Sequence, residues 1–289
     1  MFDENIRKTV LSAQRNELTE HIIYSRLSDS IRDPHNKNVL KQISEDELDH
    51  YFFWKKYSKE DVKPDRLKVL KYLLIAKIFG FTFGIKLMER GEDQAQVTYY
   101  KISKYIPEAK DIVADEDMHE KQIINMIDEE RLRYIGSTVR GLNDALVELT
   151  GAIAGFTFAL QDPRLVAMVG SITGVAASLS MAASEYLATK SESSALDPVK
   201  ASLYTCSAYI LTVIFLIYPY LILSNIYLSL ALTVLNALIV IFIFTFYISV
   251  AKDVPLKSRF VEMAFISLGI ATLSFIIGLI MRTVLKLEI

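Results

Sequence analysis

Cysteine is almost missing from this chain. Cys206 is the only cysteine among 289 residues, and it lies within an apolar segment. A disulfide framework needs at least two cysteines, and thiolate-based zinc or iron–sulfur sites need several, so the sequence excludes these classes. Any bound metal must therefore be held by carboxylates and imidazoles.

A surplus of positive charge is also missing. The formal net charge is -2, and the basic residues are interspersed with acids rather than gathered in a patch, which argues against a nucleic-acid-binding protein. Residues 1–30 are charged and contain no apolar run of the kind found in secretory signals. We therefore expect the N-terminal domain to lie in the cytosol.

Charge is distributed unevenly along the chain. Of the 66 Asp, Glu, Lys and Arg residues, 49 lie in the first 140 positions, and the 51 residues from Ala201 to Ala251 carry no charge at all. Because a buried soluble helical core rarely sustains so long an uncharged stretch, we favour a membrane domain over a soluble bundle. We divide the chain into a soluble domain, 1–138, and a membrane domain, 139–289. Five spans of about 20 residues are expected: roughly 142–160, 165–187, 201–222, 226–250 and 261–281.

Short loops between the expected spans show a positive-inside bias. The N-terminal side of the membrane would carry Arg131, Arg133, Arg140, Lys190, Lys200, Lys252, Lys257 and Arg259, against Arg164, Arg282 and Lys286 on the other side. This bias predicts a cytosolic N-terminus and an outside C-terminus.

Glycine and proline are sparse in the first 135 residues, which predicts helices throughout and an all-α fold. Prolines occur there only at positions 34, 64 and 107, between periodic segments. We expect helices over about 4–30, 35–58, a segment ending near 104, and 108–134, in the order of a four-helix bundle. The stretch 67–83 is more apolar than a solvated crossover, and could pack on the bundle, on a second subunit or on the bilayer surface.

One short sequence motif, Glu-x-x-His, occurs twice in the N-terminal domain: Glu47-Leu-Asp-His50 and Glu116-Asp-Met-His119. A Glu-x-x-His pair places both side chains on one helix face, and in carboxylate-bridged bundles two such helices combine with single acids from the other two. The first and third bundle helices offer those acids. The predicted metal ligands are Glu17, Glu47, His50, Glu89, Glu92, Glu116 and His119, and this donor set suits iron or manganese.

Other residues near these motifs are weaker candidates for a role at the metal site. A single Glu-x-x-His on a charged helix is usually a solvated surface pair, so the prediction rests on the repeat. Tyr24 lies two turns after Glu17, where it could hydrogen-bond a ligand or supply an electron. Glu20 is expected to face solvent, and either Glu89 or Glu92 could be the bridging ligand.

Acids also occur inside the expected first and second spans. Asp144 and Glu148 are one turn apart, as are Met181 and Glu185. Because ionisable groups in a bilayer are costly, these four residues form a candidate path for a divalent cation, with nearby small residues allowing close helix packing. The alternative is that Asp144 and Glu185 lie at the water interface as caps or topology markers.

Residues 10–135 resemble the rubrerythrin, or erythrin, branch of the ferritin-like superfamily. That branch often carries an extra glutamate in the third helix, as in Glu89-Arg-Gly-Glu92. The resemblance implies a di-iron centre at the predicted ligands and oxidation of ferrous iron by oxygen or peroxide. The Cys-ligated rubredoxin domain of typical rubrerythrins has no counterpart here.

The motifs Asn143-Asp-Ala-Leu-Val and Ser180-Met-Ala-Ala-Ser-Glu-Tyr resemble those of the first and second spans of the vacuolar iron transporter family. That family implies five-helix dimeric carriers of Fe(II) or Mn(II), with Asp144, Met181 and Glu185 lining the path. The glutamate-rich segment of plant members after the second span is replaced here by a short connection. Together the two halves resemble the membrane-bound ferritin, or erythrin–transporter fusion, proteins of prokaryotes.

The sequence thus predicts a homodimeric iron exporter of the inner membrane that exchanges metal for protons. One alternative is a membrane-anchored ferroxidase or peroxide-reducing enzyme whose spans only tether it. Another is a manganese carrier whose soluble domain senses metal.

Overall fold

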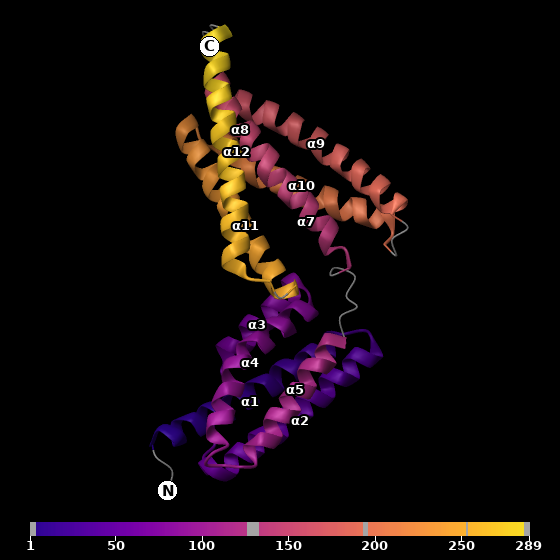
Figure 1. The fold of residues 1–289 in the computed structure, drawn as a ribbon, viewed down its shortest axis with the longest axis vertical. Helices are drawn as coiled ribbons and strands as arrows, with labels where there is room; N and C mark the ends of the chain where they lie inside the picture. The colour runs from indigo at the N-terminus through magenta and orange to yellow at the C-terminus, as the bar shows by residue number, and fades with distance from the viewer. Residues whose placement is uncertain (1–3, 126–132, 193–195, 253, 286–289) are drawn as a thin grey trace. The chain divides into compact units, whose positions relative to one another are not determined.

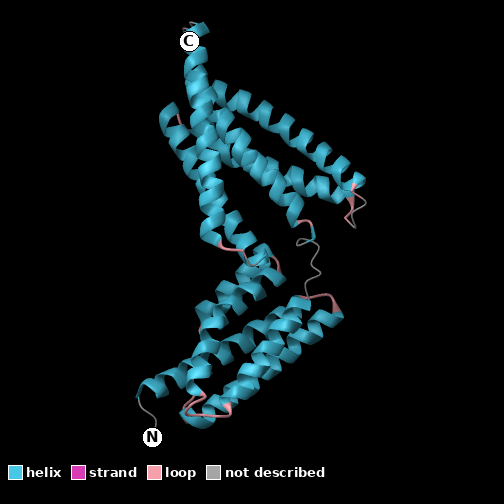
Figure 2. Cartoon of the chain, viewed as in Figure 1, coloured by secondary structure: helices cyan, strands magenta, loops and turns pink. Residues whose placement is uncertain are grey.

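The computed structural model describes residues 4–125, 133–192, 196–252 and 254–285, without the side chains of 92–101, 124, 125 and 285. Every regular element in these ranges is helical, as expected from the sequence (Figure 2). The chain divides into two compact units, Met1–Glu129 and Glu130–Ile289, which are described separately.

Unit 1 contains four long helices in the predicted order and one shorter helix that the sequence had left undefined (Figure 1). Asp33 starts the second helix by accepting a hydrogen bond from the Asn36 amide, and Pro34 occupies the first turn, where its missing N–H costs nothing. The shorter helix lies within the apolar stretch between the second and fourth helices. The bounds are α1 Glu4–Ser30, α2 Pro34–Ser58, α3 Arg66–Phe79, α4 Phe81–Ile102 and α5 Ala109–Asn125.

Two apolar clusters flank the middle of unit 1. One gathers Tyr24 and Ile43 with the inner face of α3, and the other surrounds Trp54. Both clusters are built from helical-period positions of α1, α2, α4 and α5. Between them, the same inward faces carry glutamates and histidines, so the bundle positions polar side chains in its interior.

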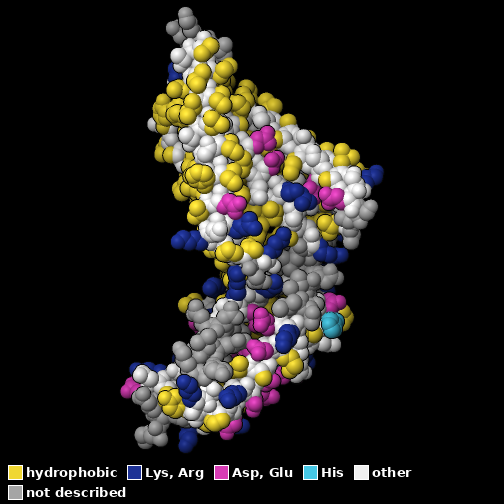
Figure 3. Space-filling model, in the orientation of Figure 1, with side chains coloured by type: hydrophobic (Ala, Val, Ile, Leu, Met, Phe, Trp, Pro, Cys, Tyr) yellow, Lys and Arg dark blue, Asp and Glu magenta, His cyan; other side chains and the backbone are white. Residues whose placement is uncertain are grey.

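Unit 2 has a largely hydrophobic visible surface (Figure 3). Four of its helices, α9 to α12, are long and apolar enough to cross a membrane, which supports a multi-pass membrane protein. The expected first span, 142–160, is divided by a π-helical turn into shorter helical pieces, so the count of five spans is not confirmed. The bounds are α7 Ile135–Asp144, η1 Ala145–Leu149, α8 Thr150–Leu160, α9 Pro163–Ser191, α10 Pro198–Ile222, α11 Ile226–Lys252 and α12 Leu256–Leu285.

Aspartate–proline pairs begin two of these helices. The Asp162 carboxylate accepts hydrogen bonds from the first amides of α9, and Asp197 does the same for α10. Within α10, Pro219 cannot donate to the carbonyl four residues earlier, that of Phe215. Asn236 of α11 supplies the missing donor at 3.0 Å, which matters where no water can do so.

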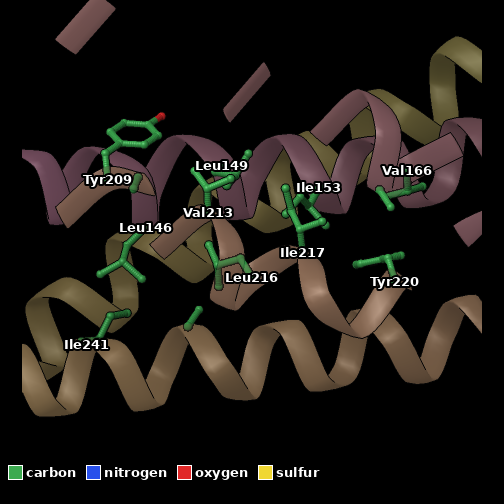
Figure 4. Close-up of a cluster of buried hydrophobic side chains, with 13 residues drawn as sticks. Leu146, Leu149, Ile153, Val166, Tyr209, Val213, Leu216, Ile217, Tyr220 and Ile241 are labelled. Carbon is green, nitrogen blue, oxygen red and sulfur yellow. The ribbon is translucent and has the colours of Figure 1, made fainter. Parts of the chain in front are cut away.

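Glycines allow the helices of unit 2 to approach closely. A Cβ on Gly141 of α7 would lie 2.4 Å from the Thr205 carbonyl of α10, and one on Gly278 of α12 would lie 2.4 Å from the Gly155 carbonyl of α8. Leucine, isoleucine and tyrosine side chains from η1, α8, α10 and α11 fill the core beside these contacts (Figure 4). The packing agrees with the small-residue pattern noted in the sequence.

Candidate metal centre and transport path

The bundle interior of unit 1 holds a cluster of acids and imidazoles. Glu17 of α1, Glu47 and His50 of α2, and Glu116 of α5 are all buried, and each offers one ligand atom such that these atoms lie within 4.8 Å of one another. His119 of α5 is also buried, with its ring centroid 6.0 Å from that of His50. The structure thus brings together five of the seven predicted ligands.

Both histidines turn the same ring nitrogen inward. His50 Nδ1 lies 3.6 Å from Glu47 Oε2 and 3.5 Å from Glu116 Oε1. His119 Nδ1 lies 3.3 Å from Glu47 Oε1 and 3.9 Å from Glu116 Oε2. The two acids of α2 and α5 therefore stand between the two imidazoles, so that each carboxylate approaches both rings.

Two aspartates that sequence reasoning missed contact the outer ring nitrogens. His50 Nε2 lies 3.4 Å from Asp115 of α5, and His119 Nε2 lies 3.2 Å from Asp46 of α2. Each aspartate directly precedes a Glu-x-x-His motif, so the repeated motif is Asp-Glu-x-x-His. Donation to an outer carboxylate fixes the tautomer of a histidine and leaves Nδ1 as the free ligand atom. The repeat of aspartate at the same offset was the signal that could have revealed them.

Charge in the cluster is shared unequally. Burial lowers the pKa of both histidines, but the Glu116 and Glu47 carboxylates outweigh it and raise the pKa of His50 to about 12 and that of His119 to about 10. Burial also disfavours the ionised form of Glu47, yet its contacts with the two imidazoles lower its pKa to about 2. In the absence of metal, protons on the histidines therefore balance the buried carboxylates.

The remaining acids hold their protons more tightly. Burial raises the pKa of Glu17 well above its usual value, and the Glu47 and Glu116 carboxylates raise it further. Burial likewise raises the pKa of Glu89 to about 8, although a hydrogen bond from Tyr24 opposes the shift. Glu89 lies within electrostatic range of Glu116 and Glu47 but outside the four-residue group above.

Tyr24, Glu92 and Glu20 are the remaining candidate residues of unit 1. The Tyr24 hydroxyl donates to Glu89, so the tyrosine contacts a predicted ligand. Glu92 lies on α4, but its side chain is outside the described residues. The expectation that Glu20 faces solvent is wrong: it is buried and paired with Lys68 Nζ of α3 at 2.6 Å, which compensates its charge.

The residues present fit a metal centre. Glu47 Oε2, His50 Nδ1 and His119 Nδ1 are buried and make no hydrogen bond of good geometry, a costly arrangement unless another partner binds them. An ion with bonds of about 2.0–2.4 Å can connect ligand atoms up to about 4.8 Å apart, which matches the spread of the cluster. Oxygen-rich ligands with imidazole suit iron or manganese.

In unit 2, two of the three predicted path acids, Asp144 and Glu148, lie at the π turn. Asp144 ends α7, and Glu148 lies within η1. The Tyr209 hydroxyl of α10 donates a hydrogen bond to the Glu148 carboxylate at 3.1 Å. Backbone angles at Asp144, Ala145 and Thr150 all remain right-handed helical, so the π turn is a local widening of one continuous helix. Such turns recur at functional sites.

Glu185 has a different environment. It is buried in α9, accepts a hydrogen bond from Ser137 Oγ at 2.7 Å, and receives the Arg140 guanidinium, with Nε at 2.7 Å from Oε2. Met181, one turn earlier, is partly buried against the core of unit 2. Among the contacts between described residues, none joins Glu185 to Asp144, so the structure shows Glu185 engaged with α7 and not with the other predicted path acids.

Comparison with known proteins bears on unit 2. Searches of curated proteins and of solved structures gave no match to the chain. The resemblance of residues 10–135 to rubrerythrins has no support from the comparisons and stays a prediction. Residues 135–197, which comprise α7, η1, α8 and α9 and end just before α10, match the VIT family. This match supports a vacuolar iron transporter-like membrane domain in unit 2, which also contains the four helices long and apolar enough to cross a membrane.

Proposed function

We propose that this protein exports Fe(II), or Mn(II), across the inner membrane in exchange for protons, and that unit 1 captures the metal in the cytosol. The observation that carries the proposal is the match of 135–197 to the VIT family, because these residues include Asp144, Glu148, Met181 and Glu185. The buried acid–imidazole cluster of unit 1 adds a second place suited to the same metals.

In unit 1, the chain's own residues would hold a ferritin-like di-iron centre. Glu47 and Glu116, which lie between the two histidines, would hold the metal together with His50 and His119, and Glu17 and Glu89 would complete the donor set. Asp46 and Asp115 orient the imidazoles. When bound, iron would supply ferroxidase chemistry toward oxygen or peroxide.

In unit 2, carboxylates would alternate between metal-bound and protonated states, which is the simplest basis for antiport. Glu185 must exchange partners in this scheme. Its carboxylate is held by Arg140 and Ser137, so an arriving cation has to displace the guanidinium before it can use Glu185 as a ligand. The Arg140–Glu185 pair represents the metal-free state of that position.

The orientation and assembly belong to the same proposal. The positive-inside bias supports a cytosolic N-terminal unit. A two-fold homodimer is the assembly that the vacuolar iron transporter resemblance implies, with one path near the subunit interface.

Metal flux in proteoliposomes tests the proposal. We expect Asp144→Asn to abolish Fe(II) flux, and Glu47→Gln to leave flux through the membrane unit while reducing metal bound by the purified protein. Glu262→Gln is the matched control, because Glu262 is an exposed acid of α12 that pairs only with Arg259 among its described ion pairs. Undiminished flux in Asp144→Asn would refute transport along this path.

A membrane-anchored redox enzyme is the second candidate, and the Tyr24–Glu89 contact favours it because a tyrosine beside a ligand can supply an electron. It predicts oxygen consumption on Fe(II) addition with no flux in any variant. A manganese carrier predicts flux of Mn(II) without oxygen consumption. Metal analysis of the purified protein together with both assays separates the three.

A further inference from the structure

The short helix α3 presents two unlike faces. Val69, Tyr72 and Ala76 pack into a core cluster of unit 1, and Lys68 pairs with Glu20. On the opposite side, Leu67, Leu70 and Leu74 are 80%, 55% and 49% exposed. The packing of unit 1 therefore accounts for only one side of this helix.

The exposed leucines form one stripe. At 100° per residue, positions 67, 70 and 74 fall within an arc of about 60°. Among the described side chains of unit 1 outside α3, other exposed large apolar residues, such as Phe52 and Met118, occur singly. Single exposed side chains need no explanation, whereas a contiguous stripe on one helix face marks an interaction surface.

The charges beside the stripe have one sign. Lys71 lies on one edge, Arg66 and Lys77 lie on the other, and all three are exposed. Residues 66–79 contain four basic residues and no acidic residue. The nearest acid in sequence, Asp65, uses its carboxylate to cap the helix by accepting from the Leu67 and Lys68 amides. A leucine stripe between two cationic edges matches a helix that lies in the plane of an anionic lipid surface.

We propose that the outer face of α3 binds the anionic phospholipid surface of the membrane in which the protein resides. The leucines enter the boundary between headgroups and acyl chains, and the flanking cations contact phosphate groups. Because unit 1 is covalently joined to a membrane-embedded unit, this contact forms at a high effective concentration and needs little intrinsic affinity. The inference stands independently of whether unit 2 carries metal.

The test uses the full-length protein in nanodiscs, with a spin label on Leu70→Cys in a Cys206→Ser background. Collision of the label with oxygen, which concentrates in lipid, is compared with collision with a water-soluble nickel chelate. In discs with about one-third anionic lipid, we expect at least a threefold higher oxygen-to-nickel ratio for position 70 than for Lys41→Cys, an exposed site on α2 of the same unit. In purely zwitterionic discs, the ratio at position 70 should fall toward that of the control.

A charge-reversed variant separates lipid binding from other occupants. Lys71→Glu with Lys77→Glu changes two exposed side chains and should return the label at position 70 to water, with the melting temperature of the protein unchanged. Three results would overturn the proposal: a ratio at position 70 equal to that of Lys41→Cys in anionic discs, a ratio insensitive to lipid charge, or spin–spin distances below about 20 Å between labels of two subunits, which would assign the stripe to a second copy of this chain.

Discussion

Metal binding to unit 1 should release at least about three protons at pH 7, because His50, His119 and Glu89 hold about three and the raised pKa of Glu17 favours a further one. The pKa values of about 12 for His50, about 10 for His119 and about 8 for Glu89 place two full protons and about nine-tenths of a third on these groups before metal arrives. Ligands must lose their protons to bind metal, so the metal has to displace them.

The sign and size of the pH effect follow from this count. A rise in pH removes competing protons and tightens binding, by at least about three decades in the overall binding constant per pH unit near pH 7, or about 4 kcal/mol. Above pH 8, Glu89 has already ionised, and the slope should fall by about one while the two histidines still carry their protons.

Calorimetry measures the protons directly. Mn(II) is titrated into the metal-free full-length protein in buffers of different ionisation enthalpy, and heat that remains in Glu47→Gln is subtracted as binding elsewhere. Glu89→Gln should reduce the release by about one proton, because an amide keeps the Tyr24 contact without a titrating proton. His21→Ala is the control outside the cluster and should leave the count unchanged. Release of fewer than one proton in the unaltered protein would refute the charge distribution described above.

Three further outcomes are expected. Asp46→Asn and Asp115→Asn should each weaken metal binding by about 10- to 100-fold, measured by competition with a chelating dye, because each aspartate orients a histidine. Gly278→Val should abolish a folded membrane unit, seen as loss of a monodisperse peak in size-exclusion chromatography, since backbone atoms occupy the space of its side chain. Asn236→Leu should lower the free energy of unfolding by about 1–3 kcal/mol in detergent titrations by leaving the Phe215 carbonyl unpaired.

The sequence predicted the helices of unit 1 and the inward faces of Glu17, Glu47 and His50 because helical spacing determines which side chains share a face. It could not place Glu20, whose burial depends on Lys68 from α3, a helix 48 residues further along the chain. The pairing of Asp46 with His119 likewise joins two helices that are distant in sequence, α2 and α5. Contacts between distant segments follow from packing, which periodicity does not encode.

For unit 2, hydropathy identified the long apolar helices α9 to α12, but not the π turn in the first expected span. A single added residue changes neither the average hydropathy of a segment nor its length enough to be noticed. Hydropathy also gave no sign that Glu185 is held by Arg140, since both residues looked like isolated charges near span ends.

The π turn has a geometric consequence for the helix that contains it. One surplus residue rotates everything after it by about 100° relative to an uninterrupted helix. Gly141, before the turn, can therefore face α10, while Gly155, after it, faces α12. A straight α-helix through the same residues would turn Gly141 and Gly155 only about 40° apart, onto one side of the helix. Removal of one residue from 145–149 would therefore leave a plain α-helix in which both glycines keep their present directions, whereas straightening the segment without a deletion would cost it one of its two neighbours.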